Sequence, residues 1–246
     1  MTTQRVPPRI GRVQLGAIPR VVLAVDGDPP ALVRQPRKAG VDLLEARVDQ
    51  FDRLNPEAVA RQIARLKRVG LPLIGTVRAR AEGGAANLSD RQRRLLYERI
   101  IPLVEAVDVD VRSSSVVKAV IAAARTHHTT VILSHHDFKK TPSATALGRI
   151  VRRADHLGAD LIKVAAMARG PEDVARLLQL TLTHHAKPLV TIAMGPHGSL
   201  SRLLFPLAGS LLTYTHRRPS HGQLPLHELV SLLRRCYPTF AATHPA

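Results

Sequence analysis

Residues 159–167 read ADLIKVAAM, a run of apolar, strand-like residues with one lysine, Lys163, at its centre. Lysine is scarce in this chain, with 7 residues against 29 arginines. An ammonium placed in an apolar strand loses hydration, which lowers its pKa and makes a neutral, nucleophilic amine available near neutral pH. A Schiff base requires such an amine. The run alone is equally compatible with a lysine whose tip reaches solvent or a carboxylate at the strand end.

Short apolar runs of this kind recur eight times, and helical patterns separate them. The predicted strands are residues 21–25, 43–48, 73–78, 107–111, 130–135, 161–166, 189–193 and 211–215. Helix-start signals such as Asn55-Pro56 and Ser89-Asp90 lie between strands. Strict alternation implies parallel strands joined by right-handed crossovers, and eight such units predict a single-domain α/β fold, the closed (β/α)8 TIM barrel. An open sheet that binds a dinucleotide would need spaced glycines after its first strand, which Asp26-Gly27-Asp28-Pro29 lacks.

Length and composition set the domain organisation. The chain has 246 residues, of which 45% are apolar, enough for one large core. We expect a polar N-terminal extension over residues 1–17 and the barrel over residues 18–240. No apolar run is long enough to span a membrane, residues 1–12 lack the apolar part of a signal peptide, and Cys236 has no second cysteine to pair with. These features predict a soluble cytoplasmic protein without membrane association.

The formal net charge of +17 raises the question of nucleic-acid binding. The basic residues are dispersed over separate helical segments, however, and aromatic residues that could stack on bases make up only 3% of the chain. We therefore expect solvated helix faces, whose field could attract an anionic small molecule, and no nucleic-acid partner. A basic nucleic-acid-binding module is the alternative, and salt-sensitive binding to DNA or RNA would reveal it.

Polar residues gather where the predicted strands end, which is where TIM barrels carry their chemistry. Glu45 and Arg47 lie two residues apart on the second strand and therefore share a face. The third strand ends at Arg78, and Glu82-Gly83-Gly84 follows it. A buried ion pair between Glu45 and Arg47, and a solvated loop carboxylate at Glu82, are the structural alternatives to a role in a site.

The fifth and seventh strands add further polar candidates. The fifth ends in Ser134-His135-His136-Asp137, and because neighbouring residues on a strand face opposite ways, the two histidines are not expected to share a metal ion. One of them, near Lys163, is a candidate general acid or base. After the seventh strand, Arg202 begins a helix and could bind a carboxylate. Residues 216–222 form a polar loop long enough for a lid, or simply a connection to the last helix.

Taken in order, these segments resemble the type I 3-dehydroquinate dehydratases, the Schiff-base enzymes of the shikimate pathway. No single segment is specific, but the ordered set is, and it covers about residues 20 to 235. The matching stretches are DLLEARVD at 42–49, TVR at 76–78 with EGG at 82–84, SHHDF at 134–138 with TP at 141–142, DLIKVA at 160–165, MG at 194–195 with SR at 201–202, GS at 209–210 and GQ at 222–223.

The resemblance implies a hydro-lyase that converts 3-dehydroquinate to 3-dehydroshikimate, the third step of chorismate and aromatic amino-acid biosynthesis. It implies that Lys163 forms an imine with the C3 ketone, that His136 transfers the protons and that Glu82 supports His136. It also implies that Arg202 binds the substrate carboxylate, and that other residues hold the hydroxyls and close the site: Glu45, Arg47, Arg78, Gln223 and Ser220. The expected enzyme is a homodimer that uses no metal and no other cofactor.

Two positions depart from the family pattern. The family usually has Ser/Thr-Ala-Pro-Gly-Gln before its last helix, whereas residues 219–223 read PSHGQ, which places Pro219 at the family's hydroxyl position and Ser220 one residue beyond it. His135 stands where an aromatic residue is usual. The alternative functions are another class I, lysine-dependent aldolase and a catalytically silent sensor of a quinate-like metabolite. The combination of Lys163, His136 and Glu82 favours the dehydratase.

Overall fold

The computed structural model describes residues 8–28, 35–184, 186–216, 218 and 222–245. Eight parallel strands form one sheet, in the order β10-β3-β4-β5-β6-β7-β8-β9. Their bounds are β3 (Val21–Val25), β4 (Leu43–Arg47), β5 (Leu73–Thr76), β6 (Ala106–Asp110), β7 (Thr130–Asp137), β8 (Leu161–Met167), β9 (Leu189–Met194) and β10 (Thr213–His216). Between β9 and β10, Leu211 N donates to Leu189 O at 3.0 Å and brings the ends of the sheet together. The predicted TIM barrel is confirmed, with strand ends within two residues of the expected ones.

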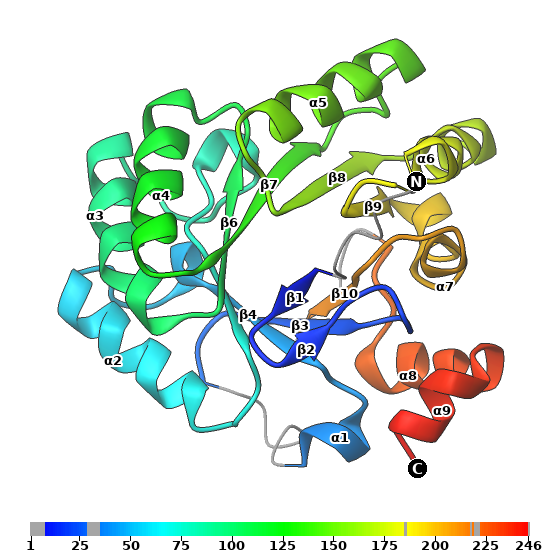
Figure 1. Cartoon of the computed structure of the whole chain (residues 1–246), viewed down its shortest axis with the longest axis horizontal. Coiled ribbons are helices and arrows are strands. Elements are labelled where there is room, and N and C mark those ends of the chain that lie inside the picture. Colours follow the sequence, from blue (N-terminus) through cyan, green and yellow to red (C-terminus); the bar gives the residue numbers. More distant parts are fainter. Residues whose placement is uncertain (1–7, 29–34, 185, 217, 219–221, 246) are drawn as a thin grey trace, which may run out of the picture.

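Helices surround this ring of strands (Figure 1). Their bounds are α1 (Pro36–Ala39), α2 (Pro56–Lys67), α3 (Asp90–Ile100), α4 (Ser114–Thr126), α5 (Ala144–His156), α6 (Pro171–Thr183), α7 (Ser201–Leu207), α8 (Leu226–Cys236) and α9 (Pro238–Thr243). The start signals act as expected, because the side chain of Asn55 accepts a hydrogen bond from Ala58 N and that of Ser89 from Gln92 N. Pro29-Pro30, a further helix-start signal in the sequence, lies outside the described residues.

The strands bury both of their faces. Outward residues such as Val107, Val109, Ile162 and Val164 pack in one cluster with the surrounding helices. Inward residues fill the barrel and form a second cluster, which includes Val22, Leu43, Ile74, Ala106, Ile132, Leu161, Val190 and Leu212. Since most positions along these strands are buried, a buried inward polar side chain must find a partner inside the barrel.

A short antiparallel hairpin, β1 (Arg9–Ile10) and β2 (Val13–Gln14), precedes the barrel. Ile10 and Leu15 are fully buried in the inward cluster, and Thr130 Oγ1, at the start of β7, donates to Arg9 O at 3.2 Å. The hairpin lies across the centre of the ring in Figure 1. The described part of the N-terminal stretch therefore covers the amino ends of the strands, and the carboxyl ends remain for a site.

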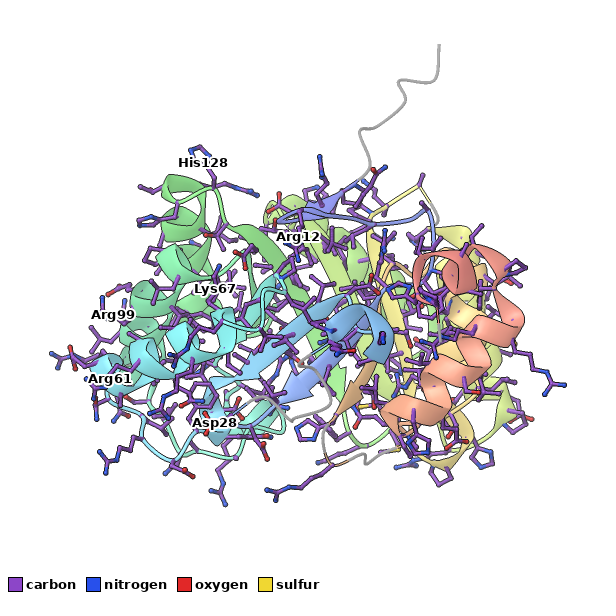
Figure 2. The ribbon with its side chains drawn as sticks, turned by 90° about the horizontal axis from the view of Figure 1, so that it is seen from below. Arg12, Asp28, Arg61, Lys67, Arg99 and His128 are labelled. Carbon is purple, nitrogen blue, oxygen red and sulfur yellow. The ribbon has the colours of Figure 1, made fainter. Side chains whose placement is uncertain are left out.

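The labelled basic residues in Figure 2 are spread over several elements, with Arg61 and Lys67 on α2 and Arg99 on α3. Arg12 and His128 mark the hairpin end of the barrel, and Asp28 lies at the opposite end. Within the described part of the chain, no helix combines the length and the apolar character needed to cross a membrane.

Candidate active site

A cavity of about 230 Å³ opens at the carboxyl ends of the strands. It brings together side chains that lie far apart in the sequence, and eight of the nine predicted site residues line it: Glu45, Arg47, Arg78, Glu82, His136, Lys163, Arg202 and Gln223. The ninth, Ser220, lies outside the described residues. One cavity therefore collects contributions from both halves of the barrel.

Lys163 points into the barrel from β8, and only 4% of the residue is exposed. Its Nζ donates to Asp108 Oδ2 at 2.9 Å and lies 3.9 Å from Glu45 Oε1. The ring of Tyr214 lies against the same nitrogen, with its centroid 4.0 Å away. The sequence left open whether the lysine is a buried amine or a side chain whose tip reaches a carboxylate. Both hold, because the amine is buried and is also paired with Asp108.

Asp108 on β6 is the partner that sequence reasoning missed. It is fully buried and also accepts hydrogen bonds from Arg78 Nη2 at 2.9 Å and Ser134 Oγ at 2.6 Å. Burial by itself would raise the pKa of Asp108, but the positive charges of Arg78 and Lys163 outweigh that effect and hold the pKa below its ordinary range. Asp108 is therefore a fixed negative charge beside the Lys163 amine.

The two histidines of β7 face opposite ways, as the period of a strand requires. His136 lines the cavity, while His135 lines a separate surface groove beside Arg149 and Arg153 of α5. Burial, followed by the charge of Arg78, lowers the pKa of His136 to about 3. The imidazole is consequently neutral at neutral pH, and one of its nitrogens has a lone pair that can accept a proton.

The carboxylate that lies against the His136 ring belongs to Asp110. Its Oδ2 is 3.8 Å from His136 Nδ1, too long for a hydrogen bond, and it accepts one from the His136 backbone N–H at 3.3 Å. Arg112 holds Asp110 through two side-chain hydrogen bonds of 2.9 Å and also donates to His136 O. Burial would raise the pKa of Asp110, but its contacts with His136 and Arg112 outweigh this and leave the pKa below its usual range.

Glu82 ends a 3-10 turn (Arg80–Glu82) and is 6% exposed. Its carboxylate accepts a hydrogen bond from Ser113 Oγ and lies 3.6 Å from Arg93 Nη2. Glu82 thus borders the same cavity as His136, but its oxygens contact Ser113 and Arg93. Asp110, which the sequence analysis did not single out, takes the position next to His136 Nδ1.

Arg202 stands near the start of α7 and is 3% exposed. Among the described residues, its Nε and Nη1 have no hydrogen-bond partner. Burial lowers the pKa of Arg202 to about 10, so the guanidinium still carries its charge at neutral pH. A buried cation without a partner is costly, and an anion bound in the cavity would offset that cost.

The other predicted binding residues already have partners inside the protein. Glu45 accepts a hydrogen bond from Thr76 Oγ1 at 2.7 Å. Arg47 donates twice to Asp49, at 3.0 and 2.9 Å. Arg78 donates to Ser134 and Asp108, both at 2.9 Å. These side chains are held rigidly at the cavity wall.

Tyr214 and His216 of β10 also line the cavity and were not predicted. Both sit on the inward face, two residues apart. Tyr214 lies in the predicted strand 211–215, whereas His216 was assigned to the polar loop that follows and is in fact the last residue of β10. The Tyr214 hydroxyl is buried without a hydrogen-bond partner among the described residues, and burial raises the pKa of Tyr214 well above its ordinary value. The phenol therefore stays protonated.

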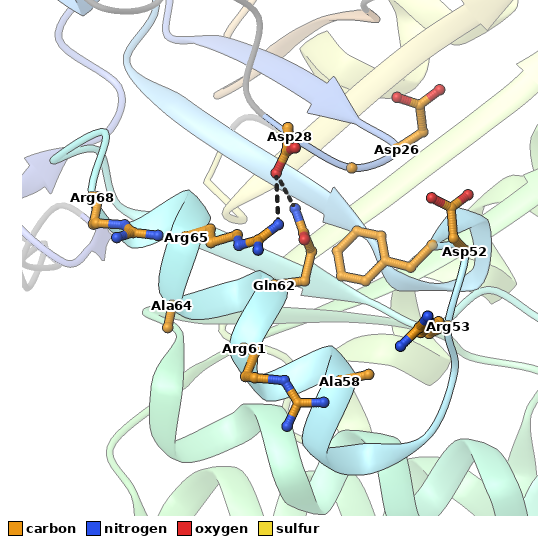
Figure 3. Close-up of a pocket in the computed structure, with 12 residues that line it drawn as sticks. Asp26, Asp28, Asp52, Arg53, Ala58, Arg61, Gln62, Ala64, Arg65 and Arg68 are labelled. Carbon is orange, nitrogen blue, oxygen red and sulfur yellow. Dashed lines mark hydrogen bonds and ion pairs between the residues drawn. The ribbon is translucent and has the colours of Figure 1, made fainter.

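A larger groove of about 550 Å³ lies beside α2 and the loops after β3 and β4 (Figure 3). Arginines of α2 line it, and Asp28 bridges part of it by accepting a hydrogen bond from Gln62 at 2.9 Å and lying 3.8 Å from Arg65. Among its described lining residues, none is a predicted site residue. Within the described part of the chain, no group of three or more His, Cys, Asp or Glu side chains could hold a metal ion.

The chain is similar to known proteins over most of its length. The model of the family Type I 3-dehydroquinase matches residues 29–238, which include every predicted site residue. The 3-dehydroquinate dehydratase of Methanosarcina acetivorans is 35% identical over 236 residues, covering 92% of this chain and 98% of that protein. The Klebsiella pneumoniae 3-dehydroquinate dehydratase is 36% identical over 203 residues, covering 78% and 81%.

Solved structures agree with these matches. The type I 3-dehydroquinate dehydratase of Clostridium difficile, determined with covalently modified comenic acid, superposes with a TM-score of 0.87 at 28% identity. The match covers 94% of this chain and 97% of that one. The similarity therefore extends over the whole barrel.

Proposed function

Since this chain belongs to the type I 3-dehydroquinase family and is a hydro-lyase acting on 3-dehydroquinate, we propose that it acts through an imine on Lys163, with His136 transferring the protons. The observation that carries this proposal is the cavity that contains the buried Lys163 amine, the neutral imidazole of His136 and the guanidinium of Arg202, whose Nε and Nη1 have no hydrogen-bond partner in the described part of the chain. These three groups match an electrophilic ketone, an acidic C–H bond and a carboxylate on one substrate.

Imine formation begins when Lys163 gives one proton to the neutral His136 imidazole and the free amine adds to the C3 carbonyl carbon. The resulting carbinolamine takes that proton back on its hydroxyl, expels it as water and leaves a protonated imine. Asp108, 2.9 Å from Nζ, supplies a negative charge next to the nitrogen that carries the positive charge. The face of the Tyr214 ring lies 4.0 Å from the same nitrogen and supports that charge in the way aromatic rings support cations.

Elimination follows from the electron demand of the protonated imine. The neutral imidazole of His136 accepts a proton from C2, and the electron pair of that C–H bond moves toward the imine nitrogen to form an enamine. The enamine returns the pair and expels the C1 hydroxyl, which leaves as water with the proton from His136. Hydrolysis of the imine then releases the product and the Lys163 amine. One histidine thus acts first as base and then as acid.

Binding orients the ring for both steps. We propose that Arg202 binds the substrate carboxylate, because its buried Nε and Nη1 have no partner among the described residues. Glu45, Arg47, Arg78 and Gln223 line the same cavity and would contact the ring hydroxyls. Hydrogen bonds within the protein hold Glu45, Arg47 and Arg78 in place before the substrate binds. Binding therefore loses less side-chain entropy.

The remaining family expectations are proposals as well. We infer that the protein is a cytoplasmic homodimer that needs no metal or organic cofactor. We also infer one catalytic domain over residues 18–240, after an N-terminal stretch whose described part is the hairpin that covers the barrel. Size-exclusion chromatography with light scattering, and turnover after treatment with EDTA, would test the first inference.

The imine is tested by reduction with borohydride in the presence of 3-dehydroquinate, followed by peptide mass mapping. We expect one adduct, on Lys163, in the wild type and in the control variant Lys118→Met, which alters an exposed lysine of α4. Lys163→Met should lose both the adduct and turnover. An adduct on a different residue, or undiminished turnover in Lys163→Met, would disprove the imine mechanism.

A further inference from the structure

His216, the last residue of β10, is a second imidazole in the cavity. Its ring is half-buried, and the charges of Asp26, after β3, and of Arg47 and Glu45 of β4 act on it. Glu45 and Arg47 are the residues proposed above to contact the substrate hydroxyls. His216 therefore lies beside the hydroxyl-binding residues Glu45 and Arg47, in the same cavity as Lys163 and His136.

The protonation of the ring follows from its backbone contact. Arg218 N–H donates to His216 Nδ1 at 2.9 Å. A proton on Nδ1 would point at the same amide hydrogen, so Nδ1 is the acceptor even though Arg218 O lies 3.1 Å away. Burial lowers the pKa of His216, so the ring is neutral at neutral pH and carries its single proton on Nε2.

This Nε2–H group is buried and has no hydrogen-bond partner among the described residues. A buried donor without an acceptor is unfavourable, and its presence in a ligand cavity indicates that a ligand supplies the acceptor. The substrate offers a carboxylate and hydroxyl groups. The carboxylate is assigned to Arg202 of α7, two of whose guanidinium nitrogens have no partner in the part of the chain that the structure describes.

We propose that His216 Nε2–H donates to a ring hydroxyl of 3-dehydroquinate, at C4 or C5, and so acts as a further substrate-binding residue. A hydroxyl can both donate and accept a hydrogen bond. On this side of the cavity the Glu45 carboxylate can accept one, and His216 Nε2–H can donate one. The inference rests on the proposed function, since it takes the substrate orientation set by Lys163 and Arg202. It makes His216 a determinant of affinity for hydroxylated rings.

Two substitutions separate the two ring nitrogens. In His216→Asn, the amide oxygen can take the place of Nδ1 as acceptor from Arg218 N–H, while the Nε2 donor is lost. In His216→Gln, the longer side chain returns an N–H donor near the Nε2 position. The control is His128→Asn, the same chemical change at an exposed residue at the hairpin end of the barrel (Figure 2), where a φ of 54° suits asparagine.

We expect His216→Asn to raise KM about tenfold, the effect of one lost hydrogen bond, with kcat within threefold of wild type. His216→Gln should recover at least half of that loss on a logarithmic scale, and His128→Asn should match wild type. An unchanged KM in His216→Asn, or equal losses of kcat and thermal stability in both His216 variants, would overturn the proposal. Borohydride trapping on the wild type tests the imine separately from the His216 contact. A missing Lys163 adduct would reject the imine mechanism, whereas the KM values of the His216 variants would still show whether His216 binds the substrate.

Discussion

Lys163 Nζ donates a 2.9 Å hydrogen bond to Asp108 Oδ2 inside the barrel, where 4% of Lys163 and none of Asp108 is exposed. The same carboxylate also binds Arg78. The nucleophile is therefore positioned by an ionised carboxylate as well as by its apolar strand. The same negative charge lies next to the nitrogen that would carry the positive charge of the protonated imine.

The first prediction concerns this carboxylate. Asp108→Asn keeps the shape of the side chain but removes the charge beside the imine nitrogen, so we expect kcat to fall by roughly 10²-fold. Two buried cations also lose their counter-ion, which should cost roughly 3–5 kcal/mol in the free energy of unfolding. The measurements are steady-state kinetics, the rate of borohydride trapping and thermal unfolding.

The control for Asp108 is Asp155→Asn, which removes a surface carboxylate paired with Lys187 at 2.7 Å. Surface pairs contribute little, so its kinetics and unfolding should match wild type. If Asp108→Asn trapped the imine and turned over as fast as wild type, the charge of Asp108 would have no part in the reaction.

The second prediction uses the two histidines that β7 presents to opposite sides. His136→Ala should lose roughly 10²–10⁴-fold in kcat, because no other group is proposed to move the C2 proton. Borohydride should still trap an adduct on Lys163 in this variant, since the amine remains. His135→Ala, which alters the outward-facing neighbour, should keep most of the activity. Equal kcat values for the two variants would rule out the assigned role of His136.

The third prediction concerns stability and pH. The pKa of His136 is about 3 in the folded protein, against 6.5 for an ordinary histidine. Below pH 6.5 the unfolded chain therefore binds a proton that the folded protein does not, so His136 lowers stability as the pH falls from about 7 toward 3. Between pH 7 and pH 5 the linkage amounts to about 2 kcal/mol.

His136→Asn removes this titration and should lose less stability than wild type over the same two pH values. Chemical denaturation at pH 7 and pH 5 measures the difference. The control is His156→Asn, at an exposed position of α5, which should follow wild type. Identical losses in His136→Asn and wild type would show that His136 is protonated in the folded protein at pH 5.

How much the sequence could predict depends on which residues obey a simple period. The alternation of strand and helix patterns identified the barrel because most strands, such as β3, β8 and β9, are enclosed on both faces and contain a run of apolar residues. The hairpin was missed because its two-residue strands have no period, and Ile10 and Leu15 are isolated apolar residues in a polar stretch.

The site shows the same limit at the level of single residues. Lys163 was identified because it is one charge in an apolar run. Asp108 and Asp110 alternate with valines in β6, a pattern that usually marks a strand with one solvated face. In a closed barrel that face points inward, and there Asp108 contacts Lys163 while Asp110 contacts His136. The sequence does not show these contacts, because they depend on β6, β7 and β8 lying side by side.

The last prediction concerns Arg202. Arg202→Gln keeps hydrogen-bond donors but removes the charge, so we expect KM for 3-dehydroquinate to rise roughly 10²-fold, while Arg202→Lys should give an intermediate value. The free protein should not lose stability, because a buried charge without a partner opposes folding. Substrate or product should raise the unfolding temperature of wild type and should not do so for Arg202→Gln. Arg176→Gln, which breaks a surface pair with Asp173, serves as the control. A wild-type KM in Arg202→Gln would mean that the carboxylate binds elsewhere in the cavity, and the orientation proposed for the ring would then be wrong.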